Sequence, residues 1–294
     1  MRVGRVDFAG TIAPAIAYKD MWVRAAVCPG APEDADVVGL LLRREELEQA
    51  LEEVDLEALR RTGYALPERD AALLLPFVGA RTIVAVGLNY REHADEVEWE
   101  APPTPLLFAK WSSALTGPFD PVPWDGSLSR QVDYEVELAA VIGRMTRDVR
   151  TEDALNHVAG YTVANDISAR DIQFSESQWT RSKSFDGFCP IGPWITTADS
   201  VPDPQSLRLR CTVNDEQRQD ASTAQMVHSV AELVAFASRG TTLEPGDLIL
   251  TGTPSGVAMG AAQPRWLVPG DVVHTEVVGL GHLLNEVVDR TVEN

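Results

Sequence analysis

A segment near the middle of the chain alternates apolar and acidic residues and then becomes wholly apolar. The alternating residues are Val132, Asp133, Tyr134, Glu135, Val136, Glu137 and Leu138, and the apolar run continues to Ile142. A period of two is typical of a β-strand, which places successive side chains on opposite faces. The apolar run indicates a strand buried on both faces. We therefore predict a strand over 132–142, with Glu135 and Glu137 on one face where the strand enters a core.

The spacing of apolar residues predicts further short elements along the chain. Strands are expected at residues 2–8, 16–18, 21–25, 82–89, 105–110 and 160–166, and after the Pro-Gly-Asp turns at 245–247 and 269–271. Helices are expected over 43–61, over 153–158 with Thr151 as cap, and over 229–240 with a Ser229–Glu232 capping box. Helical turns are expected at 90–96 and 167–173. Residues 64–79 contain two prolines, which is typical of a connection.

Two regions of different character divide the chain. Residues 1–75 combine short strands with a highly charged helix and contain no candidate chemistry. Residues 76–294 hold the longer buried strands and the candidate site residues. A chain of 294 residues is long enough for one large domain accompanied by a small one. We expect a small N-terminal domain over 1–75 and a catalytic domain over 76–294.

Glu135 and Glu137 need compensation if they lie side by side at the edge of a core. Like charges repel, and burial adds a desolvation cost. A hard divalent cation such as Mg²⁺ or Mn²⁺ compensates both, since it prefers carboxylate oxygens. The alternative is a strand whose polar face is simply exposed to water. Asp166 ends the strand 160–166 and adds a third carboxylate, which favours a metal site, although its alternative role is a helix N-cap.

His93 and Glu96 are three residues apart on a predicted helical turn, so their side chains share a face. A carboxylate beside an imidazole fixes its tautomer and raises its basicity, which is how a general base is built. The alternative is a surface histidine with an ordinary helical neighbour, and these two residues alone favour that alternative.

Two loops carry groups suited to an anion. Lys183 lies among aromatic residues, glycine and proline in the loop 179–193, where it either faces a bound anion or forms a structural salt bridge. The glycine-rich loop after the strand near 250 exposes backbone N–H groups together with the hydroxyls of Thr251 and Thr253. This loop lacks the spacing of a P-loop, so nucleotide binding is not supported.

Composition and charge exclude several classes of function. The net charge of −19 makes nucleic acid and anionic membrane surfaces unsuitable partners. No apolar run is long enough to span a bilayer, and no signal peptide is visible. The three cysteines form no Cys-x-x-Cys pair, which fits a reducing compartment. We expect a cytoplasmic protein whose partner is a small anionic substrate, bound through a metal or a few placed cations.

Six stretches together resemble the fumarylacetoacetate hydrolase superfamily, and in particular its smaller bacterial members. They occur in the family's order: Gly87–Glu96, Asp133–Leu138, Gly160–Asp171, Ser182–Asp186, Pro190–Pro193 and Pro245–Pro254. The resemblance covers about residues 80–285. It implies an α+β, β-rich fold, in which a mixed β-roll catalytic domain lies beside a small N-terminal α/β domain. It also suggests a homodimer.

The resemblance implies a metal centre in which Glu135, Glu137 and Asp166 hold Mg²⁺ or Mn²⁺. The animal fumarylacetoacetate hydrolase has a further Asp ligand seven residues before the dyad histidine, and Val86 stands at that position here. This departure argues against fumarylacetoacetate itself as the substrate.

The resemblance also implies roles in catalysis and substrate binding. His93 and Glu96 form an acid/base dyad on a short helix that closes over the substrate, and Lys183 stabilises developing negative charge. The residues implied to contact the substrate or line its pocket are Arg91, Gln173, Thr251 and Thr253.

Three functions are consistent with this set of residues. The leading hypothesis is a metal-dependent hydrolase that cleaves a C–C bond in an acylpyruvate-type 2,4-dioxo acid through a metal-stabilised enolate. The second is a decarboxylase or enol–keto isomerase that acts on a 2-oxo acid, of the oxaloacetate or hydroxymuconate type, with the same site. The third is a catalytically silent homologue that binds a metal or ligand, and the presence of both His93 and Glu96 argues against it.

Overall fold

The apolar runs assemble into one large mixed sheet in the computed structural model, which describes residues 1–28, 31, 37–76 and 80–290. In spatial order its strands are β4 (Ala65–Pro67), β3 (Met21–Arg24), β2 (Ile12–Tyr18), β1 (Arg2–Asp7), β14 (Cys189–Thr197), β12 (Val158–Asn165), β11 (Val136–Ile142), β17 (Leu248–Leu250), β6 (Ile83–Gly87) and β7 (Leu106–Lys110). Two short strands join at its side: β5 (Ala72–Leu74) pairs with β1, and β8 (Leu115–Thr116) pairs with β14.

A second sheet packs against the middle of the first. Its strands, in order, are β16 (Glu216–Ser222), β15 (Arg208–Val213), β18 (Val272–Val277), β19 (Gly281–Asp289) and β9 (Val122–Trp124). Strands β15, β18 and β19 contact β11 and β12. A small ladder of β10 (Val132–Asp133) and β13 (Ser168–Ala169) lies beside the start of β11. The two strands predicted after the turns at 245–247 and 269–271 are confirmed, because they correspond to β17 in the first sheet and β18 in the second.

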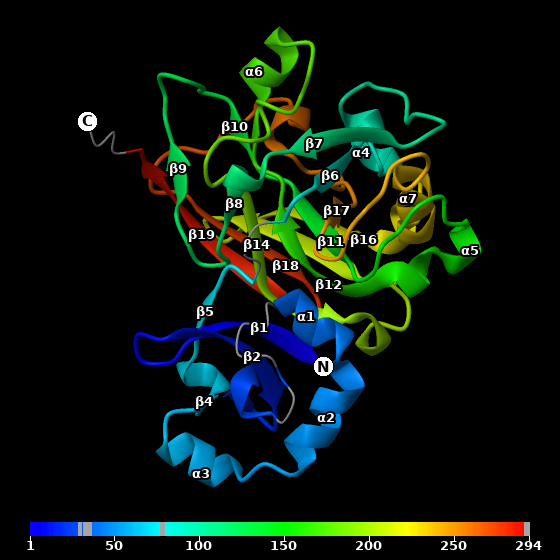
Figure 1. Ribbon diagram of the computed structural model, residues 1–294. Helices are drawn as coiled ribbons and strands as arrows, with labels where there is room; N and C mark the ends of the chain where they lie inside the picture. Colours follow the sequence, from blue (N-terminus) through cyan, green and yellow to red (C-terminus); the bar gives the residue numbers. More distant parts are fainter. Residues whose placement is uncertain (29–30, 32–36, 77–79, 291–294) are drawn as a thin grey trace.

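The helices are short and lie at the edges of the sheets. They are α1 (Val37–Leu42), α2 (Arg44–Glu52), α3 (Leu56–Arg61), α4 (Arg91–Glu96), α5 (Thr151–Ala154), α6 (Arg170–Ser175) and α7 (Val230–Ala237). Helices α1 to α3 lie beside the N-terminal strands, whereas α4 and α6 lie at the opposite end of the molecule (Figure 1).

Several helix predictions need correction. The single helix over 43–61 is wrong, because Asp55 interrupts it by accepting a hydrogen bond from the Ala58 amide (3.0 Å) as the N-cap of α3. Thr151 does not cap the next helix, since Arg150 occupies the N-cap position and Thr151 lies within α5.

The turn at 167–173 begins only at Arg170, and the connection 64–79 contains β4 and β5. Residues 77–79 of that connection lie outside the described residues. The capping box of Ser229 and Glu232 at the start of α7 is confirmed.

Strand β11 is buried on both faces, as its apolar run predicts. Leu138, Ala140 and Ile142 belong to the core shared with the second sheet and α7. Ala139 and Val141 face a second core that also contains apolar residues of β1, α1 and α2. The start of this strand is therefore held rigidly from two sides, which fixes the acidic residues that come with it.

The N-terminal region joins the main sheet through backbone pairing. Strand β1 pairs with β14 antiparallel, with Arg2 opposite Thr196 and Val3 opposite Ile195. Because Val3 and Ile195 lie in one core cluster, this region shares a hydrophobic core with the rest of the chain. The domain boundary near residue 75 stays a prediction.

Candidate metal centre and active site

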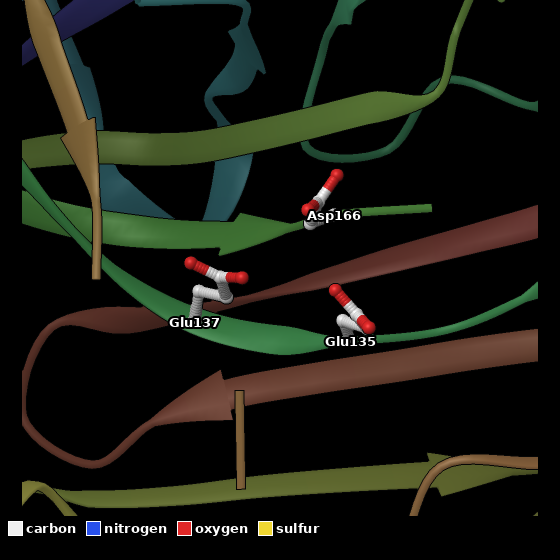
Figure 2. Close-up of side chains that lie close together, drawn as sticks. All are labelled: Glu135, Glu137 and Asp166. Carbon is white, nitrogen blue, oxygen red and sulfur yellow. The ribbon is translucent and has the colours of Figure 1, made fainter. Parts of the chain in front are cut away.

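Three buried carboxylates converge where β11 begins and β12 ends. Glu137 belongs to β11, Glu135 immediately precedes that strand, and Asp166 immediately follows β12. Each offers a carboxylate oxygen that lies within 4.8 Å of the others, and all three side chains are buried. Figure 2 shows Glu135 and Glu137 on one ribbon, with Asp166 on the neighbouring one. The structure thus brings together the three residues predicted as metal ligands.

The strand that carries these acids is interrupted, which corrects the prediction of one strand over 132–142. Tyr134 and Glu135 separate β10 from β11. The backbone N–H of Glu135 donates to Asn165 Oδ1 (2.9 Å) in place of a strand partner. The Asp166 N–H donates to the Glu135 carbonyl (2.9 Å), which holds these two residues side by side. This hydrogen bond continues the β11–β12 register, in which Val136 lies opposite Asn165, so Glu135 lies opposite Asp166.

Two cations lie directly against the triad. Lys183 Nζ donates to Glu135 Oε2 (2.6 Å) and to Asp166 Oδ2 (2.8 Å). Lys110 Nζ donates to the other oxygen of Asp166 (2.6 Å) and to the Phe188 carbonyl (3.0 Å). Both ammonium groups are buried. Buried charges of this kind persist only when they are paired and hydrogen-bonded, as these are.

A third cation, Arg170, connects the triad to a fourth carboxylate. Its guanidinium donates to Glu135 Oε1 (2.6 Å), to Asp133 Oδ2 (2.9 Å) and to Gln173 Oε1 (2.9 Å). Asp133 also accepts hydrogen bonds from the amides of Ala258 (2.8 Å) and Met259 (3.2 Å). Asp133 therefore holds the Arg170 guanidinium in place, and the guanidinium in turn orients the side chains of Glu135 and Gln173 through its hydrogen bonds.

The three carboxylates differ in how well their charge is compensated. Burial, reinforced by Asp166 and Glu135, raises the pKa of Glu137 well above its usual value. Burial acts in the same direction on Glu135, but Lys183 and Arg170 hold the pKa of Glu135 well below its usual range. Glu137 accepts one hydrogen bond from the Gly252 amide (2.7 Å), and no lysine or arginine among the described residues pairs with it. A divalent cation would supply this missing positive charge, so the donor set fits Mg²⁺ or Mn²⁺.

The predicted dyad lies on α4. His93 Nδ1 is 3.5 Å from Glu96 Oε2, and the imidazole is buried. Glu96 accepts the Gly256 N–H through both of its oxygens (3.0 and 3.1 Å). Glu96 therefore links α4 to the glycine-rich loop after β17, and it orients the ring of His93. The alternative of a surface histidine is excluded by this burial.

A small cavity of about 20 Å³ is lined by both His93 of the dyad and Glu135 of the carboxylate triad. Its lining residues are Val86, Gly87, Leu88, His93, Trp99, Phe108, Glu135, Arg170, Gln173, Trp179, Lys183, Thr253 and Met259. Such a volume holds about one water molecule, so a substrate can enter only when part of the wall moves. Helix α4, which carries His93, forms part of this wall and is tied to the glycine-rich loop by hydrogen bonds between Glu96 and Gly256 and between Glu92 and Ser255.

Two predicted substrate residues lie elsewhere. Thr251 is fully buried, does not line the cavity, and donates to the Leu138 carbonyl (2.8 Å). Arg91 is exposed and lines a separate hollow with Glu92 and Asp95. The structure thus brings Gln173 and Thr253 to the cavity, but it does not bring Arg91 or Thr251 there.

Comparison with known families identifies the fold. The family model described as "Fumarylacetoacetate (FAA) hydrolase C-terminal" matches residues 82–288. The chain belongs to the fumarylacetoacetate hydrolase family. The solved structure of a fumarylacetoacetate hydrolase from psychrophilic Exiguobacterium antarcticum is 37% identical, with a TM-score of 0.85 over 99% of this chain and 100% of that one. The expected β-rich fold is therefore confirmed.

Other relatives in this family have different reactions in their names. The mitochondrial oxaloacetate tautomerase FAHD2A of Bos taurus is 44% identical over 225 residues, which cover 76% of this chain and 71% of that protein. Maleylpyruvate hydrolase of Sphingobium sp. SYK-6, solved with manganese(II) and pyruvate, is 32% identical with a TM-score of 0.78, over 99% of this chain and 100% of that one. These two relatives are named as enzymes that act on oxo acids. Within the described residues, no helix is long and apolar enough to cross a membrane.

Sequence reasoning missed two cations of this family site. Lys110 ends the predicted strand 105–110, where nothing in the sequence marks it as a site residue, yet it is buried against Asp166. Arg170 lies in a stretch that resembles the family, but nothing in its neighbourhood predicts a contact with Asp133, which is 37 residues away. The sequence contains one pattern that could have indicated these cations. Asp133, Glu135 and Glu137 are two residues apart, so the predicted strand places all three acidic side chains on one face, and more than one cation is needed to compensate their charge.

Proposed function

We propose that this protein is a divalent-metal-dependent enzyme that hydrolyses a C–C bond in an acylpyruvate-type 2,4-dioxo acid. The observation that carries the proposal is the buried triad of Glu135, Glu137 and Asp166, with His93 on the wall of the cavity that Glu135 also lines. An acid/base group and a carboxylate metal site border one space, which is what a hydrolytic reaction on a chelating oxo acid requires.

In this proposal the triad holds Mg²⁺ or Mn²⁺ and nearby groups hold the substrate. When bound, the cation would act as a Lewis acid that offsets the negative charge developing on the 2-oxo oxygen. Lys183 Nζ adds a positive charge at the same end of the cavity. Gln173 Oε1 accepts from Arg170, so the Nε2 group of Gln173 is the one that donates to a substrate oxygen.

His93 has the geometry of the general base. Because Nδ1 lies toward Glu96, the neutral imidazole keeps its proton on Nδ1 and presents the lone pair of Nε2. In the proposed reaction Nε2 takes a proton from the water that attacks the distal carbonyl. The C–C bond then breaks with its electron pair on the pyruvate enolate, the protonated Nε2 returns its proton to the enolate carbon, and the products are pyruvate and the acid of the acyl group, which ionises to its carboxylate. Gly256 holds Glu96 in place during this transfer.

A second candidate is enol–keto tautomerisation or decarboxylation of a 2-oxo acid. The oxaloacetate tautomerases among the relatives favour it. This reaction uses the same charged end of the cavity, and in tautomerisation His93 Nε2 moves a proton at carbon without activating water. The two candidates therefore differ in whether water is consumed.

An assay of two substrates separates these candidates. The purified protein is incubated with an acylpyruvate and with oxaloacetate, in Mg²⁺ and in chelator, while pyruvate release and the enol absorbance of oxaloacetate are followed. We expect Mg²⁺-dependent pyruvate release from the acylpyruvate. If the acylpyruvate is left intact while oxaloacetate tautomerises, the second candidate replaces the first. If neither compound reacts, both proposals fail.

A further inference from the structure

Lys110, the last residue of β7, contacts the carboxylate triad without lining the cavity. Its side chain is fully buried, whereas Lys183 both contacts the triad and lines the cavity. In the proposed reaction Lys183 acts at the substrate, and Lys110 has no role. A buried ammonium group is strongly unfavourable unless it is paired, so the partners of Lys110 indicate what it contributes.

All three N–H groups of the Lys110 ammonium have an acceptor. Nζ donates to Asp166 Oδ1 (2.6 Å), to the Phe188 carbonyl (3.0 Å) and to the Lys183 carbonyl. An ammonium group has three donors and no acceptor, so its hydrogen bonding is complete. The two carbonyls belong to the two ends of segment 183–188. Lys110 therefore joins a predicted metal ligand and both ends of this segment at one point.

Neighbouring residues of Lys110 hold the same segment. The Trp111 N–H donates to Ser184 Oγ (3.0 Å), and the centre of the Phe108 ring lies 5.2 Å from Lys183 Nζ. Phe108 and Lys110 are two residues apart on one strand, so their side chains share a face. Strand β7 lies at the end of the first sheet, where it pairs with β6. The end of β7 thus supports the segment that carries Lys183.

The two oxygens of Asp166 accept from different lysines. Oδ1 accepts from Lys110, and Oδ2 accepts from Lys183, whose Nζ also donates to Glu135 Oε2 (2.6 Å). Neutralising the charge of Asp166 would not require Lys110, because Lys183 already pairs with this carboxylate. The additional hydrogen bond fixes the rotation of the carboxylate. It leaves Oδ2 as the oxygen that shares a partner with Glu135.

The use of lysine in this chain supports a geometric requirement. The sequence contains three lysines and 22 arginines. Lys110 and Lys183 are the two buried at this site, and Lys19 is exposed beside the Tyr18 ring. A compact ammonium can direct its three donors to converging acceptors, whereas the planar guanidinium fork cannot. Two of the three lysines therefore lie where that geometry is used.

We propose that Lys110 is a positioning residue for the metal centre and for Lys183. It fixes Asp166 so that Oδ2 is presented to the cation, and it holds segment 183–188 so that the Lys183 ammonium reaches the site. This inference rests on the proposed function, since it assumes that Asp166 binds the cation and that Lys183 acts at the substrate. A lysine with a purely structural role would stabilise the fold and change neither.

Electron paramagnetic resonance of bound Mn²⁺ tests the contact with Asp166 without relying on turnover. The Mn²⁺ spectrum depends on which atoms surround the ion, and residues that orient the ligands alter it. Lys110→Met should change the spectrum, because Oδ1 of Asp166 is then released. Lys19→Met removes the same charge at an exposed residue and should leave the spectrum unchanged. An unchanged spectrum in Lys110→Met would overturn the inference, whereas a wild type that binds no Mn²⁺ would overturn the proposed function and the inference with it.

A double variant tests the connection with Lys183. In Lys110→Met we expect kcat to fall by about tenfold, with less effect on KM, for whichever of acylpyruvate and oxaloacetate reacts. In a Lys183→Met background the same substitution should lower kcat by less than about twofold, because residues that act through one another are not additive. Equal losses in both backgrounds would make Lys110 a purely structural residue and overturn the inference.

Ser184→Ala provides a second variant if circular dichroism shows that Lys110→Met does not fold. It removes the acceptor of the Trp111 N–H, which is the neighbouring tie between β7 and the segment, and it changes no charge. We expect a smaller loss of kcat than in Lys110→Met, and no further loss when Lys183→Met is already present. A loss of the same size in both backgrounds, or no loss in either, would contradict the proposed support by β7.

Discussion

At the scale of single residues, the site is a set of carboxylates whose cations come from distant parts of the chain. The alternation around residue 135 and the acid at the end of the next strand predict Glu135, Glu137 and Asp166 together. Lys110 and Arg170 could not be predicted in the same way, because their contacts exist only after the sheets have formed. Local patterns report which residues share a face, and they do not report which residue from another segment meets that face.

Loss of His93 should separate hydrolysis from reactions that need no activated water. In His93→Ala we expect C–C hydrolysis of an acylpyruvate to fall by about 10²- to 10⁴-fold, the usual effect of losing a general base. Metal-assisted decarboxylation of oxaloacetate should fall less, since it consumes no water. Glu96→Gln should resemble a weaker version of His93→Ala, because the amide keeps a hydrogen bond but loses the charge. Rates of both reactions, measured side by side in Mg²⁺, check this, and an equal loss of both would assign His93 a role in closing the site.

Lys183 should affect turnover more than metal binding. In Lys183→Met we expect kcat to fall by about 10²-fold, as for loss of one group that stabilises developing charge. Mn²⁺ should bind no more weakly, because the substitution removes a positive charge from beside Glu135 and Asp166. Steady-state kinetics together with Mn²⁺ titration measure the two effects. Arg181→Met, at an exposed salt bridge with Glu176, is the matched control. Unchanged kcat in Lys183→Met would make this lysine structural.

At the scale of elements, the sequence predicts several of the buried strands, but it does not predict β14, β15, β16 or β19, and it places helix ends poorly. The buried strand β6 follows from an uninterrupted apolar run, Ile83 to Val86. The helix predicted over 43–61 fails at Asp55, because a short acidic side chain that caps a backbone N–H ends one helix and begins another. The interruption at Tyr134 and Glu135 is also invisible in the alternation, since side chains of Asn165 and Asp133 replace backbone partners there.

The capping box of α7 gives an element-scale prediction of stability. Ser229 Oγ accepts from the Glu232 amide (3.3 Å), and Glu232 accepts from the Ser229 amide (2.7 Å). Ser229→Ala should lower the free energy of unfolding by about 1 kcal/mol, the usual loss for an N-cap. Chemical denaturation at neutral pH measures this difference. An unchanged midpoint would show that packing of the apolar face alone holds α7.

The contribution of Glu232 should depend on pH. Hydrogen bonds from the Ser229 amide and hydroxyl lower the pKa of Glu232 below its ordinary value of 4.5. A carboxyl group whose pKa is lower in the folded state than in the unfolded state stabilises the folded state at pH values above its unfolded pKa. This stabilisation is lost as the pH falls through the folded-state pKa. The difference in stability between wild type and Glu232→Gln should therefore be constant above pH 4.5 and shrink below it. A difference that grows on acidification would contradict this assignment.

At the scale of the whole molecule, the N-terminal region and the catalytic sheet share one core. Side chains of β1, α1 and α2 pack with those of β11, β14 and β17. The family resemblance predicted the β-rich architecture, because six motifs in order specify it. The pairing of β1 with β14 was not predictable, since 181 residues separate the end of β1 from the start of β14, and no local pattern encodes such a contact.

Removal of the N-terminal region tests how far it is a separate unit. A fragment of residues 76–294 would expose the edge of β14 that β1 covers, together with apolar side chains such as Ile195. Exposed strand edges and apolar patches promote association. We expect the fragment to aggregate or to melt without cooperativity, as measured by size-exclusion chromatography and circular dichroism. A monodisperse fragment that melts like the full chain would show that residues 76–294 fold as an independent domain.

The central claim is that Glu135, Glu137 and Asp166 hold a divalent cation, and Mn²⁺ binding measured by calorimetry tests it most directly. Glu137→Gln preserves the shape of the least compensated ligand and removes its charge, so it is the sharpest variant. Glu232→Gln makes the same chemical change at an exposed helix end far from the triad in sequence and serves as control. The account predicts one Mn²⁺ site in the wild type and in the control, with binding abolished or weakened by about tenfold or more in Glu137→Gln. Undiminished Mn²⁺ affinity in Glu137→Gln, and likewise in Glu135→Ala and Asp166→Ala, would contradict it.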